Sequence, residues 1–328
     1  MKQLAIDTLP APARRQAFSP IDRQIVPIAL MVVAATVLLG LAHPRFLEIG
    51  NLYGLLLDLS LQMLAISGFV YVMATGEIDL SVGAVYGFTG ALAGFLMQQM
   101  GMPFAVAAAL SLGCALLFGL INGLLTVKLR LNSLMLTIGT MVLIRGLSGV
   151  LNTVLVGQTF SSAFRALARA HVGGVHVVVI VALALLVVFT VLERRTAMFR
   201  RLYLAGESAA TALLYGIRVD RIKIAAFAGS ALAAGAAGLV AASRVTHADA
   251  QLGDGLEFTL VTAAVLGGAS LSGGKGTLAG SFLGLAFLAV VVNGMVAFDV
   301  EPALQSLVVG VLLIVAVTLD RRLAARRR

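Results

Sequence analysis

A glycine-rich stretch in the last quarter of the sequence comes closest to a motif with its own chemistry. It reads GGASLSGGKG from Gly267 to Gly276. A loop of this kind binds phosphate when glycine, four residues, glycine and lysine are followed by serine or threonine. Counting back from Lys275, Ala269 stands where the first glycine is needed, and Gly276 stands where the hydroxyl is needed. The motif therefore predicts no nucleotide site in this chain.

The other reactive side chains form no catalytic or metal-binding pattern. His43, His171, His176 and His247 fall in or near the predicted outer loops, without the paired cysteine or carboxylate spacing of a metal site. Cys114 is the single cysteine, so no intrachain disulfide can form. No serine occupies a GxSxG elbow. We expect a protein that is not an enzyme, has no cofactor and binds no metal.

Composition identifies the chain as a membrane protein. Its 328 residues are 60% hydrophobic and only 12% charged, with a mean hydropathy of +1.02, whereas soluble domains are about 25% charged. The net charge of +9 comes from basic residues beside the ends of apolar segments. Such residues set membrane topology, and we expect no nucleic-acid partner. We predict one transmembrane domain, 25–320, between an N-terminal tail, 1–24, and a basic C-terminal tail, 321–328.

About ten crossings of the bilayer account for the apolar segments. A spanning helix needs roughly 17–25 mostly apolar residues. One segment, 257–270, is shorter and flanked by glycines, as expected of a broken crossing surrounded by protein. The fold class predicted is an all-α polytopic membrane protein. The full-length candidates are 25–41, 52–74, 80–98, 103–127, 133–152, 174–192, 222–243, 276–298 and 302–319.

The distribution of positive charge orients these crossings. With ten crossings and the N-terminus inside, all but five of the 24 lysines and arginines fall on the cytoplasmic side. This asymmetry follows the positive-inside rule, so both termini are predicted to be cytoplasmic. Closely spaced glycines, such as Gly83 with Gly87 and Gly235 with Gly238, indicate tightly packed helices. The five exceptions are Arg45, Arg165, Arg169 and Arg244 outside, and Arg145 within a crossing.

Four blocks of sequence carry a family resemblance. They are GEIDLSVG at Gly76–Gly83, TIGTMVLIRG at Thr137–Gly146, the loop closing on Gly216 and Ile217, and VLGGASLSGGKG at Val265–Gly276. In order and spacing they are similar to the permease subunits of bacterial ABC importers for ribose, xylose, arabinose and galactose. The positions marked by the resemblance are Gly76, Asp79, Leu80, Ser81, Gly83, Arg145, Gly267, Gly268, Gly273, Gly274 and Gly276.

The resemblance implies a function and a set of partners. It predicts a permease of the type II importer kind in the bacterial inner membrane, working as a homo- or heterodimer of membrane subunits. A periplasmic binding protein would deliver the sugar, and a separate cytoplasmic ATPase would drive transport. A gradient-driven secondary transporter is the alternative reading, although only Asp58 and Arg145 are clearly ionisable within crossings and ion coupling ordinarily needs such groups.

The longest cytoplasmic loop, Glu193 to Lys223, contains a predicted contact with the ATPase. Ser208 is a suitable N-cap for a short helix over Ala209 to Leu214. Its apolar residues need a partner surface, and the resemblance places the ATPase there. The alternative is a solvated basic connector that only orients the protein. The predicted coupling residues are Gly206, Ser208, Ala209, Ala210, Leu213, Leu214, Tyr215 and Gly216.

Three polar residues are candidates for the translocation path. Asp58 and Gln62 are four residues apart and share one face of a helix. They could offer hydrogen bonds to sugar hydroxyls, or instead be satisfied against a neighbouring helix, for example by Arg145. Asn122 is the third candidate, with helix packing as its alternative role. Asp79 is expected to cap a helix together with Ser81.

Overall fold

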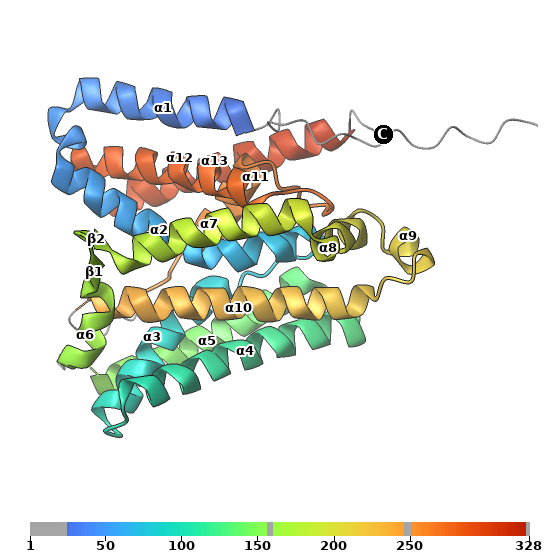
Figure 1. Ribbon diagram of the computed structural model, residues 1–328, viewed down its shortest axis with the longest axis horizontal. Coiled ribbons are helices and arrows are strands. Elements are labelled where there is room, and N and C mark those ends of the chain that lie inside the picture. Colours follow the sequence, from blue (N-terminus) through green and yellow to red (C-terminus); the bar gives the residue numbers. More distant parts are fainter. Residues whose placement is uncertain (1–24, 156–159, 246–248, 250, 326–328) are drawn as a thin grey trace, which may run out of the picture.

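The computed structural model describes residues 25–155, 160–245, 249 and 251–325, and this part of the chain is almost wholly helical (Figure 1). The predicted N-terminal tail, 1–24, lies outside the described residues. So do His247 and residues 326–328 of the predicted C-terminal tail.

Ten apolar helices of the described part correspond to the ten predicted crossings. Eight are long and apolar enough to span a bilayer, and two are shorter. The prediction of an all-α membrane protein with one crossing short or broken is confirmed in that α11 is short, and α3 is a second helix below full length. The long helices are α1 (Ile25–Ala42), α2 (Ile49–Ala74), α4 (Phe104–Lys128), α5 (Ser133–Leu155), α7 (Val177–Arg195), α10 (Val219–Arg244), α12 (Leu278–Ala297) and α13 (Pro302–Ala325), and the shorter ones are α3 (Val82–Gln98) and α11 (Leu256–Leu266).

The remaining elements lie at the two ends of the helical bundle (Figure 1). One end carries α8 (Ala197–Glu207) and α9 (Ala209–Leu214), and we call it the α9 end. The other, the α6 end, carries α6 (Ser162–Arg169) and a hairpin of β1 (His171–Val172) and β2 (Val175–His176), paired antiparallel. A short 3-10 helix, η1 (Pro44–Leu47), joins α1 to α2.

Helices α2 and α10 form the centre of the bundle, because most of their residues are buried, whereas α1 and α13 are largely exposed. Glycines bring the central helices together, as predicted. A Cβ on Gly238 of α10 would lie 1.9 Å from the Tyr86 carbonyl oxygen of α3. One on Gly90 of α3 would lie 2.4 Å from the Ala242 Cβ. Only glycine allows helices to pack at these separations.

The chain between α2 and α3 is extended and is held by hydroxyl groups of α5. Gly76 turns the backbone with a φ of 81° after α2. The Ile78 N–H then donates to Ser133 Oγ (3.2 Å), and the Leu80 N–H donates to Thr137 Oγ1 (3.1 Å). Non-helical backbone inside a membrane protein needs such partners. Two of the four sequence blocks therefore meet here.

Asp79 pairs with Ser81, the N-cap residue of α3, although no side chain accepts a hydrogen bond from an N–H within that helix. Its Oδ1 accepts hydrogen bonds from both the backbone N–H and the hydroxyl of Ser81, and both residues are buried. A carboxylate that accepts a backbone N–H at a helix start satisfies a donor with no partner inside the helix. The GEIDLSVG block thus encodes a turn, an extended segment and the start of a helix.

The glycine-rich loop between α11 and α12 is a packing motif. Gly268, Gly273, Gly274 and Gly276 all have positive φ angles, which residues with a Cβ seldom adopt. Helix α13 holds the first part of the loop in place. Its Asp320 Oδ2 accepts hydrogen bonds from the Ser270 hydroxyl and from the backbone N–H of Leu271, each at 3.2 Å. The glycines therefore allow the tight turns by which the loop connects α11 to α12.

Candidate functional site

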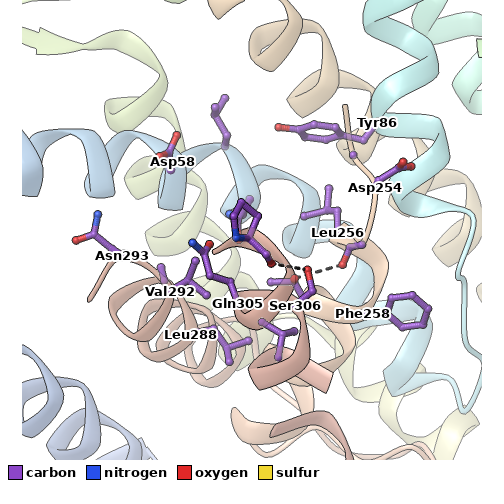
Figure 2. Close-up of a pocket in the computed structure, with 18 of the residues that line it drawn as sticks. Asp58, Tyr86, Asp254, Leu256, Phe258, Leu288, Val292, Asn293, Gln305 and Ser306 are labelled. Atoms are coloured by element: carbon purple, nitrogen blue, oxygen red, sulfur yellow. Dashed lines mark hydrogen bonds between the residues drawn. The ribbon is translucent and has the colours of Figure 1, made fainter. Parts of the chain in front are cut away.

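A cavity of about 1190 Å³ lies between α2, α10, α11, α12 and α13. In the view of Figure 2, Asp58, Tyr86 and Asp254 lie along one side, and Asn293, Gln305 and Ser306 lie across from them. The rest of the lining is mostly apolar, including Leu256, Phe258, Leu288 and Val292. A mostly apolar cavity with a few polar groups on facing walls is typical of a site for a small molecule.

Both Asp58 and Gln62, the predicted path residues of α2, line this cavity. Asp58 forms an ion pair with Arg244 at the end of α10, and its side chain remains 56% exposed. The suggestion that Arg145 could satisfy Asp58 is wrong, because Arg145 is paired elsewhere. Asp58 is therefore a charged, accessible group on the cavity wall.

Arg145 joins α5 to the start of α11. Its Nη2 lies 2.9 Å from Glu257 Oε1, and its Nε lies 3.1 Å from Asp254 Oδ1. The Glu257 side chain is fully buried, and it lies against Gly83, where an added Cβ would be 2.2 Å from Glu257 Oε2. Because a buried carboxylate needs a partner, Arg145 is a structural charge. The partners of Arg145 are therefore carboxylates at the start of α11, and not Asp58.

Asn122 lies away from the cavity. It is fully buried, its Nδ2 donates to Ser81 Oγ at 3.0 Å, and its Oδ1 accepts from Thr140 Oγ1 at 2.7 Å. These bonds connect α4 to the start of α3 and to α5. The geometry supports the alternative role in helix packing for this residue.

The predicted coupling segment protrudes at the α9 end (Figure 1). Helix α9 forms as expected, with the Ser208 hydroxyl accepting from the Thr211 N–H at 3.2 Å. The side chain of Ala212 packs toward α8, whereas Leu213, Leu214 and Tyr215 are 63%, 89% and 75% exposed. These three adjacent side chains form an apolar surface, which we call the α9 surface.

Glycines from three sequence blocks meet at the C-terminal end of α8. We call Gly76, Gly206, Gly273 and Gly274 the glycine junction. A Cβ on Gly206 would lie 1.9 Å from the Ala74 carbonyl oxygen, and one on Gly273 would lie 2.7 Å from the Gly76 Cα. The Gly274 N–H donates to the Ala74 carbonyl at 2.9 Å. The segment leading to the α9 surface is thus in backbone contact with the end of α2.

Several residues of the cavity were not identified from the sequence. Arg244 was interpreted only as a topology signal, and Asp254 and Tyr86 were not among the predicted site residues. Arg244 follows a crossing and Asp254 stands between Gly253 and Gly255, so a charged residue at a helix end or between glycines was the available signal. Gln305 and Ser306 begin α13 and carry no such signal.

Comparison with known proteins identifies relatives over nearly the whole chain. Residues 50–317 match a family model described as "Branched-chain amino acid transport system / permease component". The chain is 32% identical over 320 residues to the L-arabinose ABC transporter permease protein AraH of Azospirillum brasilense, covering 97% of this chain and 93% of the relative.

Two further relatives have similar coverage. The ribose import permease protein RbsC of Bacillus subtilis is 32% identical over 292 residues, covering 88% of this chain and 90% of the relative. The probable ABC transporter permease protein YphD of Escherichia coli is 31% identical over 308 residues, covering 93% of this chain and 92% of the relative. No solved structure matches the chain.

Proposed function

This chain belongs to the family described as the permease component of branched-chain amino acid transport systems, and we propose that it carries a monosaccharide such as ribose or arabinose, because its relatives include permeases for these two sugars. It is the membrane permease of a binding-protein-dependent ABC importer, and ATP hydrolysis resides in a separate subunit. The observation that supports the sugar assignment is the match to an arabinose permease over 97% of the chain. Since the relatives are ABC permeases, the gradient-driven alternative is set aside.

The assignment is tested by reconstitution. The permease, its ATPase and the sugar-binding protein are placed in liposomes, and uptake of radiolabelled ribose, arabinose, xylose and galactose is measured. We expect ATP-dependent accumulation of at least one of these sugars. Accumulation of a branched-chain amino acid, with no uptake of any sugar, would contradict the proposal.

The cavity is the proposed sugar path. Asp58 and Gln62 on α2 and Gln305 on α13 offer acceptors and donors to sugar hydroxyls from opposite walls. The volume of about 1190 Å³ exceeds the roughly 300–1,000 Å³ of sites that enclose a small ligand. A monosaccharide would therefore be held loosely, which leaves selectivity to the binding protein.

A second permease subunit is proposed to close the open side of the cavity. Along α13, Leu304, Leu307, Val311 and Ile314 are exposed at helical spacing, and Ile314 also lines the cavity. A second subunit against this face would complete the path. Cysteines at Leu307 in two copies, in a Cys114→Ala background, are expected to cross-link in the assembled importer. A complex that contains one permease subunit would contradict this arrangement.

The α9 surface is the proposed contact with the ATPase. Its apolar side chains would otherwise face water, and a charge placed in a buried contact costs several kcal/mol. Leu214→Asp is expected to insert normally, because Leu214 is 89% exposed, and to lose its ATPase on purification. Normal insertion with full retention of the ATPase and full uptake would leave the segment as a topology anchor only.

The proposed location is the bacterial inner membrane, with both termini and the α9 end in the cytoplasm. Cysteine labelling tests the sidedness, in a Cys114→Ala background. A cysteine at exposed Ser162 on α6 should react from outside, and one at exposed Ala210 on α9 only from inside. Ala210 is preferred to Ser208, whose hydroxyl caps the helix. Labelling of both sites from the same side would overturn this topology.

A further inference from the structure

Glu193, in the last turn of α7, accepts hydrogen bonds from three other segments. Its Oε1 receives the hydroxyl of Tyr71 from α2 at 2.9 Å and the hydroxyl of Tyr203 from α8 at 3.4 Å. It also receives the backbone N–H of Leu278, the first residue of α12, at 3.0 Å. We call Glu193, Tyr71, Tyr203 and Leu278 the Glu193 junction.

The position of this carboxylate is unfavourable for α7 itself. The C-terminal turn of a helix carries a partial negative charge, which favours basic residues such as the neighbouring Arg194 and Arg195. The ion pairs found among the described residues do not include Glu193. Its place is explained instead by the three donors that converge on it, since hydrogen bonds to a charged acceptor are roughly twice as strong as neutral ones.

Aromatic packing fixes the junction in one arrangement. The Tyr71 ring stacks on Phe189 of α7, with centroids 5.7 Å apart, and contacts Phe199 of α8 at 4.8 Å. Tyr71 is only 6% exposed, so its hydroxyl needs the partner that Glu193 provides. Helices α2, α7 and α8 are thereby held together at one point.

The junction connects the segment that bears the α9 surface to two walls of the cavity. Tyr71 belongs to α2, which carries Asp58 and Gln62 into the cavity, and Leu278 begins α12, which carries Leu288 and Asn293. Tyr203 belongs to α8, which is joined to α9 by the single extended residue Ser208. The glycine junction gives a second contact from α8, but only to α2 and to the loop before α12.

We propose that Glu193 is a positioning residue that transmits movement of α8 and α9 to the cavity helices α2 and α12. The proposal rests on the proposed contact between the α9 surface and the ATPase. When α9 moves with the ATPase, the bonds at Glu193 oblige α2 and α12 to move with α8. Without them, less of the movement of α8 reaches the cavity helices, so fewer sugar molecules are carried for each ATP hydrolysed.

The test compares three variants, each reconstituted in liposomes with the ATPase and binding protein. Glu193→Gln keeps the shape and removes the charge, Tyr203→Phe removes only the bond to α8, and Tyr71→Phe removes only the bond to α2. Glu301→Gln, an exposed carboxylate at the α6 end, is the matched control. The measurements are ATP hydrolysis, sugar uptake and the ratio of sugar transported to ATP hydrolysed.

The expected result is uncoupling. Hydrolysis should stay within about twofold of the unmodified importer, whereas the transport ratio should fall about five- to tenfold in Glu193→Gln and in Tyr203→Phe, a change typical of positions that couple two sites. The double variant Glu193→Gln with Tyr203→Phe should lose little more than the more affected single variant, because one change weakens and the other removes the same bond between Glu193 and Tyr203. The Glu301→Gln ratio should be unchanged.

Two results would overturn the proposal. One is an unchanged ratio in both Glu193→Gln and Tyr203→Phe. The other is a parallel fall of hydrolysis and uptake, which a purely structural role would produce; Tyr203→Phe decides this even where Glu193→Gln folds poorly. Leu214→Asp in the same liposomes distinguishes failure of the proposed ATPase contact from failure of the proposed role of Glu193. If it retains the ATPase and full uptake, the proposed ATPase contact has failed, whatever the Glu193 variants show.

Discussion

The α9 end and the cavity are built in different ways. At the α9 end, backbone meets backbone, as where Gly206 lies against the Ala74 carbonyl and Gly273 lies against Gly76. The cavity helices also touch through glycine, as where Gly284 of α12 lies against the Ala263 carbonyl of α11, but between these contacts polar side chains line an open space. Asp58 pairs there with Arg244, and Gln305 donates to the Val300 carbonyl while lining the cavity. The difference is that the helices around the cavity enclose a space of about 1190 Å³, whereas the glycine junction consists of close backbone contacts.

This difference matches what each region is proposed to do. A junction that transmits movement must be rigid, because a soft contact would absorb the displacement. A path for a polar solute must hold water and rearrange, so its groups need to be accessible. Arg145 and Glu257 are the exception on the cavity side, because the partly exposed Arg145 pairs there with the fully buried Glu257, next to cavity-lining Asp254. They stabilise the wall behind the open space.

The largest effect on stability is expected from Arg145→Gln. It leaves the Glu257 carboxylate fully buried without its cation, and breaking a buried pair from one side costs about 3–5 kcal/mol. Thermal unfolding of the purified permease in detergent should show a large drop in midpoint. This would show that the cavity region contains one rigid element.

The control for this prediction is the double variant Arg145→Gln with Glu257→Gln. Removing both charges should restore much of the lost stability, because neither is then buried alone. If the single variant unfolds at the same temperature as the unmodified protein, the ion pair is not what holds α11 against α5.

A smaller effect on stability is expected from Gly206→Ala at the glycine junction. The new Cβ would be placed 1.9 Å from the Ala74 carbonyl oxygen, so backbone has to shift. Overpacking of this kind typically costs about 1–3 kcal/mol. The displaced α8 should also lower uptake more than ATPase binding, as measured in liposomes and by co-purification.

Gly139→Ala is the matched control, since no heavy atom of a neighbouring element lies within 4 Å of the added Cβ. It lies within a helix, where alanine is favoured over glycine by about 1 kcal/mol. We expect equal or better stability and normal uptake. If Gly206→Ala behaves like Gly139→Ala, close backbone contact at the α9 end is not required.

The contrast between the two regions also explains what the sequence could predict. Glycine spacings and the Asp79–Ser81 pair are local, and the prediction that they mark tight packing and a helix start is confirmed. The short α9 helix and its Ser208 cap were also local signals, and they too are confirmed. Ten apolar segments followed from hydropathy alone, although α3 begins at Val82 rather than at residue 80, because the chain after Gly76 is not helical up to that point.

The polar partners could not be predicted, because they depend on how helices distant in sequence face one another. Asp58 pairs with a residue 186 positions away, and Glu193 receives donors from α2, α8 and α12. Nothing near Asp58 in sequence distinguishes Arg244 from Arg145 as its partner. For the same reason Asn122 could be assigned to the path or to packing, and only the three-dimensional arrangement places it away from the cavity.

The smallest effect on stability is expected from Asp58→Asn, and it sharpens the comparison best. The pair with Arg244 is largely solvent-exposed, at 56% and 34% for the two side chains, and exposed ion pairs contribute about 0–1 kcal/mol. The unfolding midpoint should therefore barely change. If Asp58 accepts sugar hydroxyls, loss of the charged acceptor should lower uptake at low sugar concentration about three- to tenfold, the range of one hydrogen bond.

Asp299→Asn is the matched control, because Asp299 is exposed at the α6 end, does not line the cavity, and has a φ of 56° that asparagine tolerates. Normal uptake by Asp58→Asn would remove this residue from the path, whereas a large fall in its stability would mean that the cavity wall is as rigid as the α9 end.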